Sequence, residues 1–181
     1  MANDLSMAAD DATLNRRVAE GNRGAFDVLV MRHEQRLRGF LRKLAGTHAA
    51  DDLAQEAFIR AWQRADQFSG SGSYAAWLLR IGWHVFLDTK RHQASLHRRH
   101  DEAPVPPTRH DPSYETGIDI IAALSTLAPK ERACILLCDV EGWSHTEAAN
   151  LLDMPLGTLK SMVARAKARL RDQLIPPHTE P

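Results

Sequence analysis

The chain has 181 residues, enough for one domain or two small ones, and its 23 Lys and Arg residues balance its 23 Asp and Glu residues. A net charge of zero argues against non-specific coating of DNA and leaves only local basic patches to consider. No apolar run is long enough to span a membrane, and residues 1–12 lack the basic start and apolar core of a signal peptide. We therefore expect a cytoplasmic protein without membrane contacts.

Four helices are predicted in the N-terminal half, because apolar residues recur there at helical spacing and Gly or Ser residues interrupt the pattern. The second helix is basic on its outer side, and the third has acidic residues in its first turn, where they complement the helix dipole. Short connections indicate a small independent bundle. In chain order the helices cover Ala12–Glu20, Arg23–Ala45, His48–Phe68 and Tyr74–His92, with Asp11, Thr47 and Ser73 as the expected N-caps of the first, third and fourth.

The third helix carries the first group of candidate contact residues. Asp51, Asp52, Gln55 and Glu56 give it an acidic, hydrogen-bonding face that suits basic groups on a protein partner. One alternative is a face that is merely solvated and complements the helix dipole. Another is a set of three carboxylates holding Mg²⁺ for nuclease chemistry, but no second acidic cluster or general base accompanies them.

The loop Ser69–Ser73 is a second candidate site. Its small residues would let a nucleic-acid backbone approach closely, and Tyr74 at its rim could stack on an extruded base. A plain loop with a partly buried Tyr74 is the alternative. For Trp77 and Trp83 two interpretations likewise remain, a place in the core or a surface on which bases stack. Farther along the fourth helix, Arg91 belongs to a basic end that suits a phosphate backbone or is merely solvated.

Helical periodicity disappears after the fourth helix, in a segment rich in Pro and His. Residues 93–117 are therefore predicted to be a flexible linker between two domains, 12–92 and 118–175. Helical patterning resumes at Ile118–Leu127 and again at Lys130–Val140, where Pro129 occupies the favoured first-turn position. The predicted fold is all-α, with two small helical domains.

The two cysteines, Cys134 and Cys138, are spaced i, i+4 and share one helical face. We interpret them as small buried apolar residues. A zinc site would need further ligands, and His145 is the only nearby candidate. A disulfide one helical turn apart would be strained, and a redox role remains the alternative.

The stretch Glu141–Arg171 contains two helical patterns on either side of a break at Pro155. Ser144 and Glu147 form a capping box at the start of the first helix, and Pro155 prevents that helix from continuing. The second helix, about Leu156–Asp172, presents Lys and Arg residues with no acid among them until Asp172. This arrangement predicts a helix-turn-helix whose second helix enters the major groove, and the alternative is a solvated αα-hairpin.

This stretch resembles the promoter-reading C-terminal region of bacterial RNA polymerase sigma factors, most closely the extracytoplasmic-function (ECF) subgroup. One departure is Met162, where the family commonly carries Arg, so that a contact is missing or supplied by Arg165. The resemblance is carried by Asp139–Gly142, Ser144, Glu147–Ala149, Leu152, Pro155, Gly157–Ser161 and Arg165–Ala166.

A second match lies in the N-terminal half. Asp51–Trp62 resembles the polymerase-binding helix of the family. The part that melts and reads the minus-ten promoter element is matched by Phe68, Gly70, Tyr74, Trp77–Ile81, Val85 and Leu87–Asp88. Two matches in the right order with a linker between them are specific.

The resemblance implies a sigma factor whose partners are core RNA polymerase and promoter DNA, both duplex and single-stranded, with an anti-sigma protein as a candidate partner. It implies no catalytic centre, metal or cofactor. His84 stands where the family leads one to expect Asn, and helical spacing predicts an accessible His84 beside the DNA path or paired with Asp88. The implied contacts are Asp51, Asp52, Gln55 and Glu56 with polymerase; Ser69, Gly70, Ser71, Tyr74, Trp77, Arg80, His84 and Arg91 with the minus-ten element; and Thr158, Lys160, Ser161, Arg165, Lys167 and Arg169 with the minus-thirty-five element.

The main alternative is a free-standing helix-turn-helix regulator that binds duplex DNA without polymerase. Its N-terminal bundle would then serve for dimerisation or ligand binding. A regulator should footprint a palindromic duplex alone, whereas a sigma factor should need core polymerase.

Overall fold

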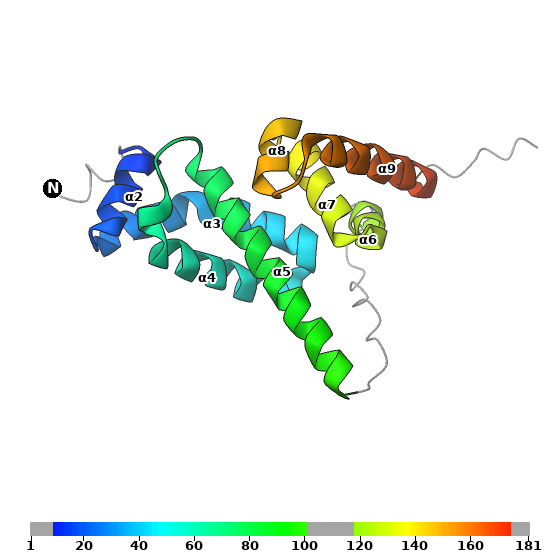
Figure 1. Ribbon diagram of the computed structural model, residues 1–181, viewed down its shortest axis with the longest axis horizontal. Helices are drawn as coiled ribbons and strands as arrows, with labels where there is room; N and C mark the ends of the chain where they lie inside the picture. The colour runs from blue at the N-terminus through cyan, green and yellow to red at the C-terminus, as the bar shows by residue number, and fades with distance from the viewer. Residues whose placement is uncertain (1–8, 101–117, 175–181) are drawn as a thin grey trace, which may run out of the picture. The chain divides into compact units, whose positions relative to one another are not determined.

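The computed structural model describes residues 9–100 and 118–174, and within them all regular structure is helical (Figure 1). The chain divides into two compact units, Met1–His100 and Asp101–Pro181. The prediction of an all-α chain with two helical domains is confirmed at the level of fold class. In the described ranges no helix is long and apolar enough to cross a membrane.

The first unit is a helical bundle in which α3, α4 and α5 pack against one another and α2 covers one end (Figure 1). A Cβ atom at Gly82 in α5 would lie 2.8 Å from Cδ1 of Leu37 in α3, so a glycine at this position lets the two helices approach closely. Phe40, Trp83 and Phe86 are among the largest fully buried side chains. The elements are α2 (Asp11–Ala19), α3 (Arg23–Ala45), α4 (Thr47–Gln63), the 3₁₀-helix η1 (Ala65–Gln67) and α5 (Tyr74–His100).

Two predicted N-caps are wrong by one residue. The carboxylate of Asp10, and not Asp11, accepts a hydrogen bond from the Thr13 N–H at 2.7 Å and caps α2. Thr47 is the first residue of α4, and Gly46 precedes it with φ 90° and no side-chain cap. Gly46 has no side chain with which to cap α4, and its positive φ lets the chain turn directly from α3 into α4.

Two helix ends also differ from the prediction. The third helix was expected to reach Phe68, but α4 ends at Gln63 and η1 follows it. The fourth was expected to end at His92, but α5 continues to His100. Residues 93–100 contain neither Gly nor Pro, so nothing there stops a helix that has already begun. The first part of the predicted linker is therefore helical, and residues 101–117 lie outside the described residues.

The second unit places the long helix α9 against α6, α7 and α8 (Figure 1). Pro129 begins α7, as predicted, and the last turns of this segment wind as a π-helix. The predicted capping box is present, since Ser144 N donates to Glu147 Oε2 and Glu147 N donates to Ser144 Oγ. The elements are α6 (Ile118–Thr126), α7 (Pro129–Ile135), the π-helix η2 (Leu136–Val140), α8 (His145–Leu151) and α9 (Leu156–Leu174).

Both cysteines lie in or beside the core of this second unit. Cys134 is buried and its sulfur lies 3.9 Å from the Met154 sulfur, while Cys138 is half-buried. Burial raises the pKa of the Cys134 thiol to about 12 and also raises the pKa of Cys138. Two protonated, poorly reactive thiols fit the interpretation of small apolar residues.

Candidate nucleic-acid and protein interfaces

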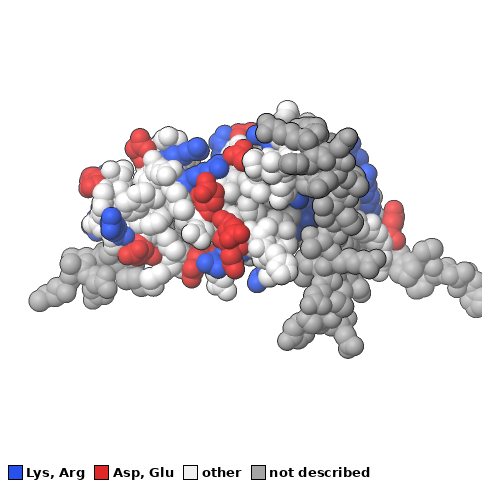
Figure 2. All heavy atoms as spheres, turned by 90° about the horizontal axis from the view of Figure 1, so that it is seen from below, with Lys and Arg blue, Asp and Glu red and all other residues white. Residues whose placement is uncertain are grey.

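The four predicted polymerase-contact residues all lie on α4, and three of them are exposed. Asp51 is exposed and forms an ion pair with Arg38 at 2.6 Å, whereas Glu56 is half-buried and accepts a hydrogen bond from Arg60 at 2.7 Å. Asp52 and Gln55 are exposed. Figure 2 shows Asp and Glu side chains next to Lys and Arg side chains on the face that it draws.

Arg60 connects this face of α4 to α5. Its guanidinium donates to Asp88 Oδ2 and to Glu56 Oε1, each at 2.7 Å. These two hydrogen bonds, that with Asp88 first, raise the pKa of Arg60 above its ordinary value. Asp88 also accepts a hydrogen bond from Arg91 at 3.3 Å. Its carboxylate therefore already has two arginine partners besides the predicted partner His84.

An apolar groove of about 440 Å³ lies beside the acidic face, between α3 and α4. Phe26 of α3 meets Trp62 edge-to-face with ring centroids 5.0 Å apart, and Ile59 is 44% exposed. The sequence alone does not reveal this groove, because helical spacing places Phe58 and Trp62 next to the buried Ala57 and Ala61, yet both aromatic side chains are only half-buried. The adjacent apolar pair Phe58 and Ile59 was the available signal, since one helix face cannot bury both.

The loop between η1 and α5 is exposed over Ser69–Ser73. The hydroxyl groups of Ser69 and Ser71 lie 2.6 Å apart, and Gly70 and Gly72 have positive φ. The loop thus presents small polar residues and backbone to solvent.

The structure corrects the placement of Tyr74. Its ring is 2% exposed and packs against Phe68, Trp77 and His33, with centroid distances of 5.2–5.5 Å. Tyr74 begins α5 and faces inward, so it is not a rim residue, and burial raises the pKa of its hydroxyl. Phe68, Trp77 and His33, the other members of this cluster, are half-buried.

The other predicted minus-ten residues lie along α5. Arg80 and Arg91 are exposed, and His84 is half-buried, which is less accessible than predicted. Trp83 is a core residue stacked on Phe86 with centroids 5.6 Å apart, which excludes it from the surface. One helix thus carries both the core contacts of the bundle and a row of polar side chains.

The six predicted minus-thirty-five residues lie on α9 but differ in their surroundings. Lys160 and Arg165 are exposed, and the Ser161 hydroxyl donates to the Thr158 carbonyl at 2.8 Å. Lys167 instead forms an ion pair with Asp139 at 2.8 Å. The buried stripe of the helix is Leu159, Val163 and Ala166, which recur at helical spacing, with Leu170 half-buried.

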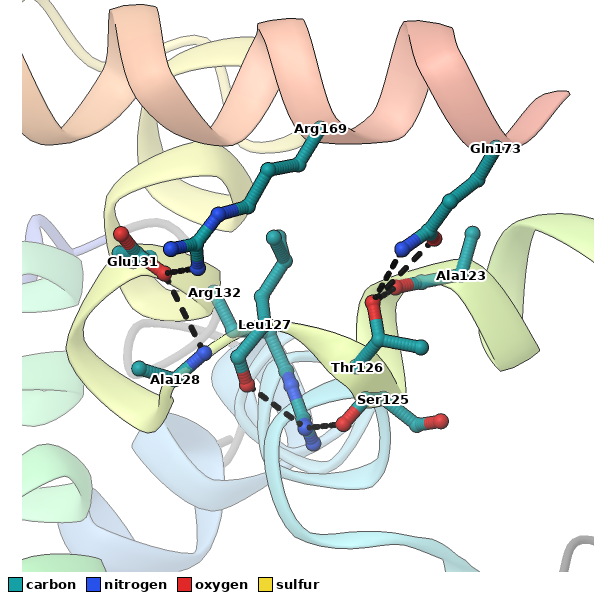
Figure 3. Close-up of polar contacts among 9 residues, drawn as sticks. All are labelled: Ala123, Ser125, Thr126, Leu127, Ala128, Glu131, Arg132, Arg169 and Gln173. Carbon is teal, nitrogen blue, oxygen red and sulfur yellow. Dashed lines mark hydrogen bonds and ion pairs between the residues drawn. The ribbon is translucent and has the colours of Figure 1, made fainter. Parts of the chain in front are cut away.

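Arg169 belongs to a polar network that sequence reasoning did not anticipate (Figure 3). It donates to Glu131 Oε2 at 2.9 Å, and the same oxygen accepts from the Ala128 N–H at 3.3 Å. Glu131 is only 7% exposed. Farther along α9, Gln173 and Thr126 exchange hydrogen bonds at 3.0–3.2 Å.

Arg132 caps the C-terminal end of α6 beside these contacts. Its guanidinium donates to the carbonyls of Ser125 and Leu127 at 2.6 and 3.3 Å, which satisfies carbonyl groups left over at a helix end (Figure 3). Together these contacts fix the C-terminal half of α9 against the α6–α7 turn. Partners that are 38 to 47 residues apart in sequence leave no local signal.

Comparisons with known proteins agree with this geometry. Residues 29–96 match the family model described as Sigma-70 region 2, and residues 118–170 match Sigma-70, region 4. A helical bundle of the first kind followed by a helix-turn-helix unit of the second kind defines a two-region sigma factor. The ECF RNA polymerase sigma factor SigC of Mycobacterium tuberculosis is 32% identical over 170 residues, covering 90% of this chain and 92% of that protein. The chain belongs to the ECF family of RNA polymerase sigma factors, which direct promoter-specific transcription.

Two further similarities are informative. SigE of Mycolicibacterium smegmatis is 35% identical over 159 residues, and the match spans 83% of this chain and 62% of that longer protein. The sigma factor RpoE, solved in complex with the anti-sigma factor NepR from Bartonella quintana, is similar in structure with a TM-score of 0.75 and 28% identity. That match covers 84% of this chain and 98% of RpoE.

Proposed function

We propose that the first unit binds core RNA polymerase through α4 and the neighbouring α3–α4 groove. The observation that carries this is the combination of an acidic face and an apolar groove on adjacent surfaces. Asp52 and Gln55 offer polar contacts. Phe26, Ile59 and Trp62 offer apolar surface that the fold of the first unit leaves partly exposed. Interfaces that combine an apolar centre with a polar rim are typical of specific protein partners.

The exposed loop Ser69–Ser73 and the polar row of α5 then contact the opened minus-ten element, and α9 reads the minus-thirty-five element. We assign the contact with the minus-ten element to residues 12–92 and the reading of the minus-thirty-five element to residues 118–175. The exposed contacts of α9 are Lys160, Ser161 and Arg165. Because Lys167 and Arg169 already hold carboxylate partners, we assign them to orienting the helix as well as to DNA phosphates.

The chain has no catalytic role in this proposal, because RNA synthesis belongs to the polymerase, and it acts in the cytoplasm where polymerase is found. An anti-sigma protein is a proposed further partner. The structure of RpoE with NepR supports this, since a protein of similar fold is captured with an anti-sigma factor.

Run-off transcription with purified core polymerase and a genomic promoter library tests the function as a whole. We expect transcripts from a subset of promoters with a shared pair of elements, and no DNA footprint by the chain without polymerase. A footprint on a palindromic duplex by the chain alone, without stimulation of polymerase, would instead establish the free-standing regulator.

Charge reversal tests the polymerase interface. Asp52 is exposed and lies outside the ion pairs described above, so Asp52→Lys should weaken binding to core polymerase while the melting temperature changes little. Glu20→Lys, another exposed acid at the end of α2, is the matched control and should bind normally. Binding is measured by pull-down at two salt concentrations. Equal retention of both variants would remove α4 from the interface.

A further inference from the structure

Sulfur-bearing side chains gather in the second unit, beside the turn of the helix-turn-helix. Cys134 of α7 is fully buried, and its Sγ lies 3.9 Å from the Sδ of Met154. Cys138 comes four residues later in η2, the π-helix that continues α7, so it lies about one turn farther along the same side. Because Met154 is 20 residues from Cys134 in sequence, the spacing of the cysteines does not indicate this third sulfur.

The backbone holds Met154 in its place beside Cys134. Met154 lies in the turn between α8 and α9, and its N–H donates to the Ala149 carbonyl at 3.0 Å. The preceding residue, Asp153, takes the left-handed conformation with φ 50°. Pro155 follows directly and ends any continuation of α8. The thioether is therefore positioned by the turn itself, before any ligand binds.

The distance between the two sulfur atoms fits two ligands of one metal ion. Sulfur ligands at about 2.3 Å from a metal in a trigonal plane lie about 4.0 Å apart. An ordinary contact between two sulfur atoms has a similar length, so the chemistry of the ligands decides which guest is suited. Two thiolates and a thioether are soft ligands, and such ligands select Cu(I).

Other metals fit this set of ligands less well. Zinc in a structural site takes four ligands from Cys, His, Asp and Glu. In residues 9–100 and 118–174, no group of three or more such side chains could hold a metal ion. Magnesium and calcium need oxygen ligands, which the cluster of Cys134, Cys138 and Met154 does not supply.

The surroundings of the cluster allow an ion to enter and offset its charge. Cys134 is buried, whereas Cys138 and Met154 are half-buried and form the side that solvent reaches. Two thiolates around a monovalent cation leave one negative charge. Burial and then Asp139 raise the pKa of the Cys138 thiol, whereas Lys167 lowers it, so a lysine ammonium lies close enough to favour the negative charge.

We propose that Cys134, Cys138 and Met154 form a binding site for one Cu(I) ion. On binding, the thioether donates a lone pair and the two thiols release their protons to solvent, while copper and sulfur keep their oxidation states. The bound ion fastens the α7–η2 segment to the turn between α8 and α9 and so stabilises the helix-turn-helix. This inference is independent of the polymerase and promoter contacts proposed above.

Anaerobic titration of the reduced full chain with Cu(I), against bicinchoninate as a competing chelator, measures the affinity. We expect one tightly bound ion per chain. Met154→Leu, a substitution of similar size, should weaken binding at least about tenfold, since even the loss of an outer-shell partner costs a metal site about 10- to 100-fold. Met162→Leu is the matched control, because Met162 is another half-buried methionine of the same unit, and it should bind as the wild type does.

Two further measurements separate a built site from two thiols that bind copper by themselves. X-ray absorption at the copper edge should show three sulfur ligands at about 2.3 Å in the wild type and two in Met154→Leu. In concentrated urea the wild type and Met154→Leu should bind Cu(I) alike, because the unfolded chain keeps both cysteines and loses the position of Met154. Cys138→Ala removes a half-buried ligand and should abolish one-to-one binding in the folded chain.

The outcomes that would overturn the inference are equally definite. Absence of one-to-one binding, or equal affinities of the folded wild type and Met154→Leu, would leave the three side chains as core packing. An equal loss of affinity in Met162→Leu would attribute the effect to disturbed packing and overturn it as well. If Met154→Leu fails to fold, the ligand count in the wild type decides, since a copper ion with only two sulfur ligands contradicts the proposed site.

Discussion

The pair Glu131–Arg169 should respond asymmetrically to the removal of each partner. Glu131 is 7% exposed, whereas the Arg169 side chain is 57% exposed. Arg169→Ala leaves a buried carboxylate whose only donor among the described residues is the Ala128 N–H, so it should destabilise the second unit by about 1–3 kcal/mol. Glu131→Gln keeps an acceptor for Ala128 and leaves Arg169 free to reach water. It should therefore cost only about 0.5–1 kcal/mol, close to the value for an exposed ion pair.

The two variants should also separate at the promoter. Glu131→Gln releases the Arg169 guanidinium, so binding to the minus-thirty-five element should be kept or strengthened, whereas Arg169→Ala should lose stability and affinity together. Urea denaturation of the full chain gives the free energies of unfolding, and the double variant closes the thermodynamic cycle. Holoenzyme binding to duplex promoter DNA gives the affinities. Equal destabilisation by both single variants, with no coupling energy between them, would refute the reasoning.

Three further predictions concern other parts of the chain. Arg165→Ala should weaken promoter-complex stability by about 1–3 kcal/mol if Arg165 contacts a base, with relaxed specificity at one position in a randomised selection, and no change on any template would contradict the proposed docking of α9. Gly39→Ala should stabilise the bundle by about 0.5–1 kcal/mol, because a Cβ atom there meets nothing within 4 Å. Gly82→Ala should be about 1–3 kcal/mol less favourable, because its Cβ atom would overpack the contact with Leu37. Equal free energies of unfolding for the two variants in chemical denaturation would contradict this prediction. The Cys134 thiol should resist alkylation in the native state up to about pH 9 and react on unfolding, and rapid labelling of the native protein detected by mass spectrometry would contradict this. Because folding raises the pKa of this thiol from 9.0 to about 12, its contribution to the free energy of unfolding is lost as the pH rises through that range.

Features set by neighbouring residues could be predicted from the sequence. The capping box of Ser144 and Glu147 and the break at Pro155 depend on hydrogen bonds and steric clashes within a few residues. The buried stripe of α9 follows from its helical spacing. These local signals account for the all-α fold class and for the helix-turn-helix.

Features set by distant residues could not be predicted. Phe68 and Trp77 are near neighbours of Tyr74, but its enclosure also requires His33 of α3, which the sequence around Tyr74 does not reveal. In the same way, the partner of Lys167 lies in the π-helix of a preceding segment, so an apparently free basic face contains intramolecular ion pairs. Likewise, the buried Asn15 amide donates to the Ala65 carbonyl, a partner 50 residues away in sequence that no local pattern indicates.

The position of Arg60 between α4 and α5 has a thermodynamic consequence. Its guanidinium is shared by Glu56, on the proposed polymerase side, and Asp88, on the helix proposed to follow the DNA. A polymerase group that competes for Glu56 leaves Arg60 to Asp88 alone and alters the charge presented along α5. Linkage is reciprocal, so promoter DNA that draws on Asp88 or Arg91 must change polymerase affinity by the same factor. Under these two proposed roles, Arg60 would couple holoenzyme assembly to promoter engagement, and Arg60→Gln should uncouple the two equilibria in a four-state binding measurement.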